Sequence, residues 1–524
     1  QAPLMIEDPL LGRDDRALVE PLTSIHSVGG YLEALQQRRL LDLQPVRDAS
    51  FLLNLWLRRA TGHGHFHATN FVLWALIVLL VHRLLRTLPV PPGVALVATC
   101  LFAVHPSLAM AVSWVAARKH LLSCLFILLA TLGMRRAVRV GNSPSLTLGT
   151  LIAYGLSVFA QPITVLWPVW AALVTWREGG SQRRSLGWIP ALSLPVMAAC
   201  IVLNFRYYTG DYVAQVSADK FVEGSHGGVG LLALGRAFFN LVAPVRIATS
   251  YDPGSSYNLV GLLLLPAFGL WIVRRLNLTQ GLGWTVFALL PLAVVLGRMT
   301  HIFLSDPYLL TPGVGLTCLV ALLAAPIGSW YPGRRCAASL LSVVTGVGLL
   351  VLTSGVARSW HSDAQVWARA YDVAPTPNAL SKHAYFLASA GQTEEAFKVG
   401  LRLKEWAPAH PEAEYVLSRA IFLDRGLSTQ QKAALIAEHG LEGPWTSYFR
   451  AVLQVRLGRP QEAVDQISEA LEKPEAFKAE LPVIVAEATL LCALAHQTSC
   501  ERFASRFRSH PFWSEPRFRE RLKQ

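Results

Sequence analysis

Charged residues are scarce in this sequence. Lys and Arg number 47 and Asp and Glu 34, together 15% of 524 residues, whereas soluble domains carry about 25%. This deficit excludes an ordinary soluble protein for most of the chain. The net charge of +13 does not indicate a nucleic-acid partner. Much of the surplus is Arg in short loops between apolar runs, where it sets membrane topology.

Metal-binding patterns are also missing. The chain has seven cysteines and 15 histidines, but none of their spacings is typical of a zinc site. We therefore expect no metal and no resident cofactor. Cys492 and Cys500 lie in the charged C-terminal third, where they either form a disulfide across a helix–loop junction or remain free thiols.

Apolar runs dominate residues 65–357. A membrane-spanning helix needs about 20 mostly apolar residues, and ten segments reach or approach this length. Several are short or contain proline, which a membrane tolerates where protein or water covers the broken backbone. The sequence therefore predicts an all-α fold with a polytopic membrane domain. The ten segments are 66–86, 93–113, 120–134, 147–160, 162–176, 187–203, 258–273, 281–297, 308–325 and 337–356.

Arginines indicate how this domain is oriented. One set of alternate loops holds twelve Arg and a single acid, Glu178, whereas the opposite loops mix bases with Asp and Glu. The positive-inside rule places the Arg-rich set in the cytoplasm. Residues 1–64, expected to form a loop, then lie outside, as do 204–257, 298–307 and everything after 357. The twelve are Arg83, Arg86, Arg135, Arg136, Arg139, Arg177, Arg183, Arg184, Arg274, Arg275, Arg334 and Arg335.

Segment 229–249 is apolar enough to span, but both of its flanks lie outside under this topology. It also contains Arg236, Asn240 and Arg246, so we expect an amphipathic helix at the outer interface. The chain begins at Gln1 rather than Met, and nothing before residue 65 would target it to a membrane. A preceding signal peptide or membrane span is therefore expected.

Residues 358–524 are rich in charge and carry a repeat. GQTEEA at 391–396 and GRPQEA at 458–463 are similar, and their alanines stand 67 residues apart. This is about two periods of the 34-residue tetratricopeptide repeat. We expect three helical hairpins and a capping region, which form a soluble α-solenoid on the outer side. It either offers a concave surface to a partner or acceptor protein or serves as a structural cap.

Ionisable residues near the outer face are the candidates for chemistry, because placing them there is costly unless they react or pair. They come from four distant segments, so acids and bases are expected to converge on one side. The candidates are Asp14, Asp15, Arg47, Asp48, His105, Arg118, Lys119, Arg298, His301 and Asp306. The simpler roles are a solvated pair for Asp14 and Asp15, a local ion pair for Arg47 and Asp48, headgroup contact for Arg118 and Lys119, a structural hydrogen bond for His105 and helix capping for Asp306.

These segments resemble the transmembrane-and-tetratricopeptide-repeat glycosyltransferases. LFAVHPSLAMAVSWVAARKHLLS at 101–123 is similar to their His-Pro, Trp and Arg-Lys signature, and GRDDRALVE at 12–20 to their Asp-Asp motif. Shorter matches are DLQPVRDASFLLN at 42–54, FHATNFVLWAL at 66–76 and SDPYLLTPGVGL at 305–316. The resemblance covers most of the chain and implies a GT-C fold of about eleven spans.

The resemblance implies an enzyme that moves a sugar, such as mannose, from a polyprenyl-phosphate carrier to a protein or other acceptor on the outer face. Asp14 or Asp15 would take the acceptor's proton. Arg118, Lys119 and Arg47, with His105 in support, would bind the donor phosphate, and Asp306, His301 and Arg298 are secondary candidates. Abundant Ala and Leu, and Arg in excess over Lys, favour a bacterial inner membrane with a periplasmic outer side.

Two departures from the family pattern keep a second interpretation open. Gln161 stands where the family has Lys, and Pro307 where it has Arg, so each change removes a cation. The alternative is a catalytically inactive GT-C-like membrane scaffold whose external repeats bind partner proteins within an assembly.

Overall fold

The computed structural model describes residues 15, 18–37, 40, 42–208, 227–247, 256–276, 278–296, 306–326, 332–410 and 412–470. The regular elements in these ranges are all helices, and several are apolar enough to cross a membrane. The predicted all-α membrane fold is therefore confirmed. The chain divides into two compact units, Gln1–Ala374 and Pro375–Gln524, which are described separately below.

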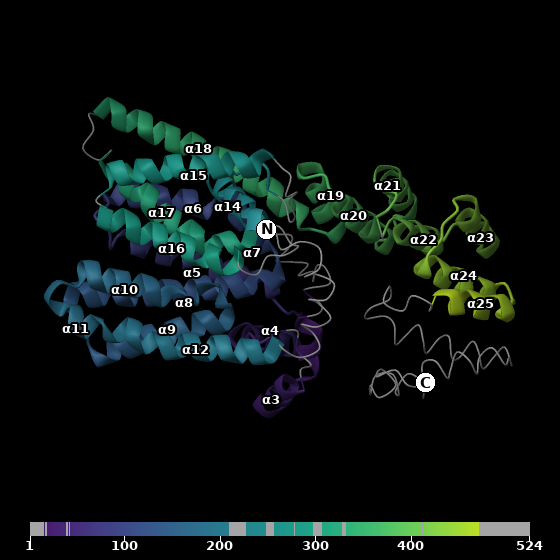
Figure 1. Ribbon diagram of the computed structural model, residues 1–524, viewed down its shortest axis with the longest axis horizontal. Helices are drawn as coiled ribbons and strands as arrows, with labels where there is room; N and C mark the ends of the chain where they lie inside the picture. Colours follow the sequence, from purple (N-terminus) through teal and green to yellow (C-terminus); the bar gives the residue numbers. More distant parts are fainter. Residues whose placement is uncertain are drawn as a thin grey trace. The chain divides into compact units, whose positions relative to one another are not determined.

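The apolar segments of the first unit form helices that lie side by side (Figure 1). Five helices of the described part are long and apolar enough to span, or six if the bent pair α6 and α7 is one span. The count of ten spans remains a prediction. The helices formed by the apolar segments, including those too short to count as spans, are α5 (Phe66–Leu85), α6 (Pro92–Ala103), α7 (Pro106–Ser113), α8 (Arg118–Val140), α9 (Pro144–Ala160), α10 (Trp167–Glu178), α12 (Trp188–Tyr208), α15 (Ser256–Arg275), α16 (Leu278–Leu296), α17 (Leu310–Ala324) and α18 (Pro332–Ser359).

Prolines break two of the predicted spans. The chain bends by 58° between α6 and α7, where Pro106 opens the second helix. A proline is tolerated in the first turn, since its missing N–H has no helical partner there. Between α9 and α10 the short helix η3 (Pro162–Thr164) replaces regular helix. Every residue of α7 is buried, so protein rather than lipid surrounds the break.

The N-terminal stretch is not the loop that was expected. It contains η1 (Glu20–Ser24), α3 (Val28–Gln36) and α4 (Pro45–Thr61). Helix α4 forms because its polar and apolar residues segregate: one face, with Phe51 and Leu55, is buried, while Trp56 on another face is 69% exposed. An exposed Trp on an amphipathic helix is typical of a membrane interface.

The first unit extends past residue 357, where the composition placed its end. Val356 and Trp360 pack with Met110 of α7 in a small apolar cluster. Helix α19 (Asp363–Val373) joins the same unit, because Val366 belongs to that cluster and the Arg369 Nε donates to the Ile247 carbonyl at 3.1 Å.

Helix α14 (Gly227–Val242) lies within the segment expected to be amphipathic. Its polar residues are buried rather than exposed to headgroups: Arg236 is 2% exposed and Asn240 is fully buried. The Arg236 Nη2 donates to the Arg246 carbonyl at 2.7 Å, so this buried cation has a partner within the protein. Arg246, just past the end of the helix, is exposed, and the position of the helix at the outer interface remains a prediction.

Helices α14 and α15 cross at two glycines. A Cβ built on Gly261 would lie 1.8 Å from the carbonyl oxygen of Gly235, and one built on Gly235 would lie 2.1 Å from the carbonyl of Asn258. Both distances are far shorter than any van der Waals contact. Only glycine allows the two backbones to approach this closely.

The substitution Gly261→Ala is expected to lower the free energy of unfolding by about 1–3 kcal/mol, since the overpacked helices must separate. Gly269→Ala is the matched control on the same helix, where a Cβ meets nothing within 4 Å. It is expected to be neutral or stabilising by up to about 1 kcal/mol. Thermal unfolding of both variants in one detergent measures the difference. Equal melting temperatures would contradict the close crossing.

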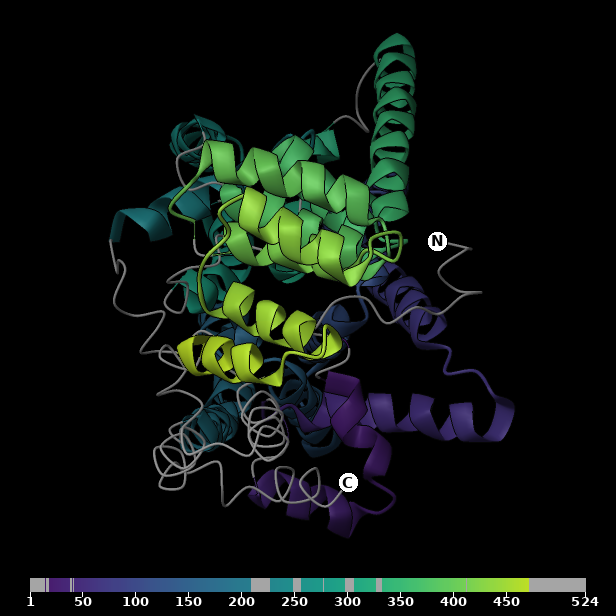
Figure 2. The same ribbon diagram turned by 90° about the vertical axis from the view of Figure 1, so that its right-hand side faces the viewer.

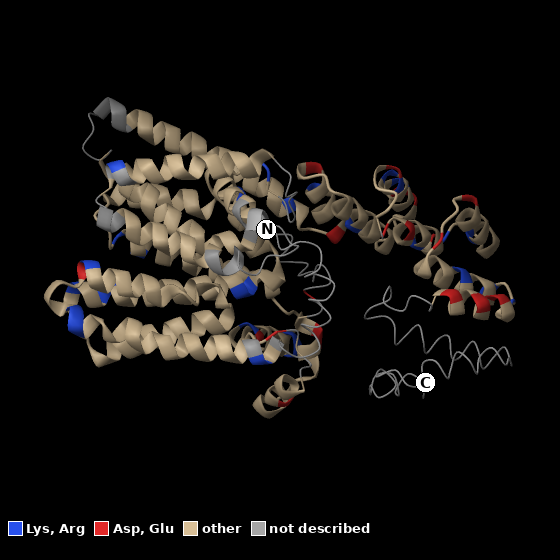
Figure 3. Cartoon of the chain, in the orientation of Figure 1, with Lys and Arg blue, Asp and Glu red and all other residues tan. Residues whose placement is uncertain are grey.

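Basic residues lie at both ends of the first unit in Figure 3, and the Arg that end several helices lie at the left end. The helices α5, α8, α10 and α15 all carry Arg in or next to their last turns. The acid of this group, Glu178, forms an ion pair with Arg135. The Arg-rich loops therefore share one end, as the topology requires; that this end faces the cytoplasm remains a prediction.

The second unit contains six described helices that pack as consecutive pairs, coloured green to yellow in Figure 2. Gly391 and Gly458 open the two similar motifs and have φ of 81° and 75°, which glycine adopts most easily. Ala396 and Ala463 are fully buried, so the repeated positions are a turn and a close helix contact. The helices are α20 (Pro377–Ser389), α21 (Thr393–Trp406), α22 (Ala413–Leu423), α23 (Thr429–Glu438), α24 (Pro444–Arg456) and α25 (Pro460–Ala470).

The assignment of these pairs to the tetratricopeptide class remains a prediction. The expected capping region, with Cys492 and Cys500, lies outside the described residues.

An ion pair connects the first two helix pairs. The Lys382 Nζ of α20 donates to the Glu412 carboxylate at 2.9 Å, and the Ser381 hydroxyl donates to the same group. Burial raises the pKa of Glu412, but the charge of Lys382 and the two hydrogen bonds outweigh burial and hold the pKa below its usual 4.5. An acid whose pKa is lower in the folded state than in the unfolded state stabilises the fold at pH values above its unfolded-state pKa. This stabilisation is lost as the pH falls through its folded-state pKa.

The substitution Glu412→Gln is expected to weaken this unit by about 0.5–1 kcal/mol at pH 7, because the pair is partly exposed. The difference from the native chain should shrink as the pH falls below 4.5 and vanish once Glu412 is protonated. Hydrogen exchange of residues 377–389, corrected for the intrinsic effect of pH, measures it. The exposed Glu405→Gln is the control. An effect of Glu412→Gln that is the same at pH 7 and pH 4 would exclude the pair as its cause.

Candidate functional site

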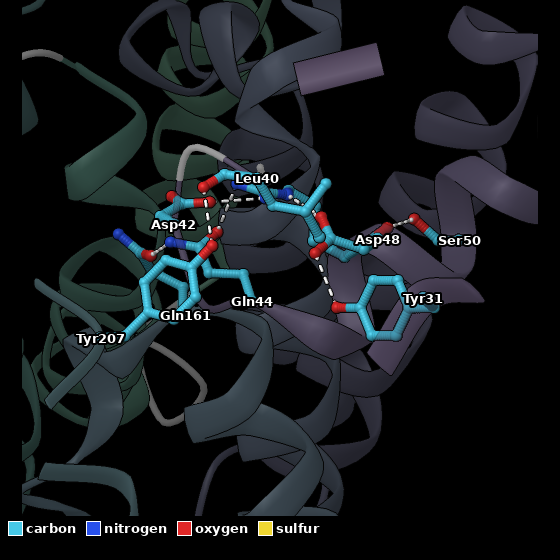
Figure 4. Close-up of polar contacts among 9 residues, drawn as sticks. Tyr31, Leu40, Asp42, Gln44, Asp48, Ser50, Gln161 and Tyr207 are labelled. Carbon is cyan, nitrogen blue, oxygen red and sulfur yellow. Dashed lines mark hydrogen bonds and ion pairs between the residues drawn. The ribbon is translucent and has the colours of Figure 1, made fainter. Parts of the chain in front are cut away.

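A closed group of polar side chains surrounds Arg47 in the first turn of α4 (Figure 4). The guanidinium is 1% exposed. Its Nε and Nη2 donate to Asp48 Oδ1 at 2.9 and 2.6 Å, and Nη2 lies 2.5 Å from Asp42 Oδ1. Its Nη1 donates to Gln44 Oε1 at 3.0 Å. The other Asp48 oxygen accepts from the Tyr31 hydroxyl at 2.8 Å. We call these five residues the Arg47 cluster.

The Arg47 cluster contains one cation and two acids, which shift one another's pKa. Burial alone would lower the pKa of Arg47, but Asp42 and Asp48 outweigh burial and raise it. Burial, with the neighbouring Asp48 charge, raises the pKa of Tyr31, so the phenol stays a donor. Burial also raises the pKa of Asp48, against the attraction of Arg47. All three guanidinium nitrogens of Arg47 have partners, so the local ion pair, the simpler role for this residue, describes its geometry.

Gln161 connects the Arg47 cluster to the break between α9 and η3. The Gln44 Nε2 donates to Gln161 Oε1 at 2.7 Å, and Gln161 is 9% exposed. A second hydrogen bond joins the N-terminal segment to α12: the Tyr207 hydroxyl donates to the Leu40 carbonyl at 2.7 Å. The residue that replaces the family's Lys is therefore a hydrogen-bond partner of the N-terminal segment. A Lys at this position would place a second cation beside Gln44, which already binds Arg47.

Arg118 is enclosed by three elements and is fully buried. Its Nε donates to Asn70 Oδ1 at 2.8 Å, and its Nη2 to the Phe66 carbonyl at 2.7 Å. Its Nη1 donates to Asn54 Oδ1 and, at 3.3 Å, to the Ser50 carbonyl. The rings of Phe51 and Phe66 cover it, with centroids 4.6 and 5.7 Å from Cζ. We call these residues the Arg118 cage; in it Arg118 neither reaches headgroups nor presents a donor to a phosphate.

Asp15 lies beside the same turn. It is 1% exposed, and its Oδ1 accepts from the backbone N–H of Ala116 at 2.7 Å. The apolar cluster around it joins Leu18 and Leu22 to Phe51, Phe66 and Val115. The structure thus brings one predicted acid to a residue two positions before Arg118 and three before Lys119, the predicted cations. Lys119 is half-buried, and Asp14 lies outside the described residues.

The structure describes only some of the remaining candidate residues. His105 precedes α7, and its Nε2 lies 3.1 Å from the Leu241 carbonyl, which is the simpler, structural role. Asp306 begins the short helix η5 (Asp306–Leu309). In that helix Tyr308 packs edge-on against His120, with centroids 4.7 Å apart. Arg298 and His301 lie outside the described residues.

Sequence reasoning missed the amides that complete these groups. Asn54 and Asn70 are 1% and 0% exposed, and Asn70 also donates to the carbonyls of Val112 and Trp114. Both lie in or beside apolar runs, where an amide is costly to bury without partners. That signal was available in the sequence. Their shared partner, Arg118, could not be identified from it, because Arg118 lies 64 residues from Asn54 and 48 residues from Asn70.

A small apolar cavity lies between α8, η3, α10, α16 and α17. It measures about 10 Å³ and is lined by Ile127, Trp167, Trp170 and Phe287 among others. This is about the size of one water molecule, and none of the candidate residues lines it. Among the described residues, no three His, Cys, Asp or Glu side chains gather closely enough to hold a metal ion.

Comparison with known proteins gives a partial similarity. The chain is 38% identical over 101 residues to the protein O-mannosyl-transferase TMTC1 of Mus musculus and 37% identical over 101 residues to that of Homo sapiens. The matched part is 19% of this chain and 10% and 11% of the two relatives, so the chain matches about a tenth of their length. No family model and no solved structure matches the chain. The similarity supports a relationship to TMTC-like proteins.

The substitution Arg118→Lys tests the Arg118 cage, because it replaces the planar guanidinium with a single amine. Arg118→Lys keeps the charge but loses most donors to Asn54, Asn70 and two carbonyls, and unsatisfied buried groups cost about 1–3 kcal/mol each. We expect a net loss of about 2–4 kcal/mol, measured as thermal unfolding in detergent. Arg136→Lys, at an exposed position of the same helix, should change stability by less than about 0.5 kcal/mol. A variant Arg118→Lys as stable as this control would rule out the cage as a structural element.

Proposed function

We propose that the chain is a membrane glycosyltransferase that moves a sugar from a polyprenyl-phosphate carrier to a protein acceptor on its outer face. The observation that carries the proposal is the convergence of Asp15 with the turn before α8, at a backbone hydrogen bond of 2.7 Å. An acid and two bases from distant segments meet there, as the family resemblance implies. The similarity to two protein O-mannosyl-transferases supports the same class of reaction.

The proposed step is a single displacement at the anomeric carbon. The acceptor hydroxyl oxygen forms the new glycosidic bond while a carboxylate of the Asp14–Asp15 pair takes its proton. The bond from the anomeric carbon to the phosphate oxygen breaks, and its electron pair leaves with the lipid phosphate. A cation at the membrane surface stabilises that charge. Mannose is the sugar we favour, and the outer face is the periplasm if the chain is bacterial.

The hydrogen bonds of the cations support a narrower set of proposed roles than the sequence suggested. Arg118 is enclosed in its cage and acts as a positioning residue for the turn at 114–118. We assign the binding of the donor phosphate to Lys119, which follows Arg118 in the chain and is half-buried. Arg47 positions α4 through Asp42 and Asp48. The acceptor protein is proposed to approach through the repeats of the second unit.

A second candidate function is favoured by one observation. Arg47 and Arg118, both predicted phosphate ligands, have their guanidiniums engaged by protein groups, and Gln161 supplies a neutral contact where the family has a cation. Such a site would hold the helices together without chemistry. The chain would then be an inactive scaffold whose repeats recruit partner proteins.

Transfer of radiolabelled mannose from polyprenyl-phosphate mannose into membrane and exported proteins tests the proposal. Asp14→Asn and Asp15→Asn remove the proton acceptor, and Asn at 15 keeps an oxygen that can accept from Ala116. We expect one of them to lower transfer by at least about 100-fold. Asp465→Asn, at an exposed position of α25, should leave transfer unchanged.

The outcomes separate the two candidates. Label transfer by the native chain that both Asn variants retain would exclude this pair as the base. No transfer by the native chain, from mannose or other polyprenyl-phosphate sugars, would instead favour the scaffold. Folding of every variant is checked by its melting temperature in detergent, so that loss of activity is not confused with loss of structure.

A further inference from the structure

The arginines at the Arg-rich end fall into two groups with different electrostatics. Arg83, Arg135, Arg139 and Arg177 lie in the last turns of α5, α8 and α10 or one turn before. Helix C-termini carry partial negative charge, so cations there are favourable. Arg135 and Arg139 also donate to the Thr87 carbonyl that follows α5. Arg135 and Arg139 therefore have partners within the protein.

Arg183 and Arg184 form the second group and lie in a four-residue helix just before α12. They occupy α11 (Arg183–Leu186), which leads directly into α12, and both are exposed. The Asn142 Nδ2 donates to the Ser185 carbonyl at 2.7 Å, so the start of α9 lies beside them. The first turns of α9, α11 and α12 contain no acid. Two cations thus add to the partial positive charge of helix N-termini, an arrangement that an anion stabilises.

An exposed apolar surface begins next to these cations. Leu148 and Ile152 follow one face of α9 and are 59% and 54% exposed, and Leu192 of α12 is 43% exposed. The two helices are neighbours, since a Cβ on Gly155 would lie 3.8 Å from Val196. Trp188, 63% exposed, stands between Arg184 and Leu192 in the chain. Trp is typical of the level where lipid headgroups meet acyl chains.

We propose that this surface is a binding site for one anionic phospholipid. Arg183 and Arg184 hold its phosphate, Trp188 lies at the level of the ester groups, and the acyl chains follow Leu148, Ile152 and Leu192. Charge complementarity selects the occupant, because among the described residues Arg183 and Arg184 have no acidic partner. Basic residues beside membrane-exposed helices bind such headgroups. We name residues 148, 152, 183, 184, 188 and 192 the lipid site.

The lipid site is separate from the proposed sugar-transfer site. Arg118 begins α8 and Val140 ends it 22 residues later, so the two ends of that helix lie about 33 Å apart. The turn after Val140 contacts α11, whereas the Arg47 cluster and the Arg118 cage lie at the other end. The lipid proposal therefore does not depend on the proposed function.

Native mass spectrometry of the detergent-purified chain, titrated with phosphatidylglycerol or phosphatidylcholine, tests the lipid site. We expect Arg183→Gln/Arg184→Gln to weaken phosphatidylglycerol binding on the order of tenfold or more and to leave phosphatidylcholine binding unchanged. Arg83→Gln/Arg86→Gln is the matched control, with the same loss of charge at the C-terminal end of α5. It should change either affinity by less than about threefold.

Equal losses in the two double variants would show a diffuse charge effect and overturn the proposal, as would no loss in either. Displacement of the bound lipid by millimolar inorganic phosphate would reveal an anion site without a lipid requirement and would also overturn it. Quenching by brominated phosphatidylglycerol gives an independent readout. It should exceed quenching by brominated phosphatidylcholine, and Trp188→Phe should remove most of that excess; a persistent excess would place the lipid elsewhere.

Discussion

The buried guanidinium of Arg118 is the interaction on which the end of the first unit opposite the Arg-rich loops depends. One planar group joins three helices: α4 through Asn54 and the Ser50 carbonyl, α5 through Asn70 and the Phe66 carbonyl, and α8 at its own first residue. A charge this deep is stable only when its donors are satisfied. The aromatic rings that cover it exclude water and strengthen those bonds. The position of α4, and with it of the Arg47 cluster, follows from this one group.

The large-scale organisation could be predicted from the sequence because it depends on composition. Apolar runs of 15 to 20 residues gave the positions of helices to within a few residues, and the two glycine motifs gave two turns of the second unit. The change to a charge-rich composition after residue 357 predicted a separate C-terminal part, and the structure divides the chain at Ala374. Where each helix breaks was harder, since Pro106 and Pro162 do more than mark a turn: they end one helix and begin another, and the angle of 58° is set by packing around α7.

The candidate site could be predicted only in part. Sequence patterns placed an acid near Arg118 and Lys119, and Asp15 lies there. The same patterns could not say whether a cation faces substrate or protein, because that depends on partners such as Asn54 and Gln44, which are distant in the chain. The helix at 45–61 was also missed, because charged and polar residues interrupt its apolar positions and suggested a loop. Buried amides are the signal that would have corrected both interpretations.

The glycine crossing of α14 and α15 has a mechanical consequence. The carbonyls of Asn240 and Leu241, near the end of α14, accept from Ser107 and lie against His105, directly at the proline break. Because the crossing leaves no space between the two backbones, we expect the two helices to move together rather than separately. A change of angle at the bend between α6 and α7 would then displace both helices, which would couple the middle of the bundle to its edge.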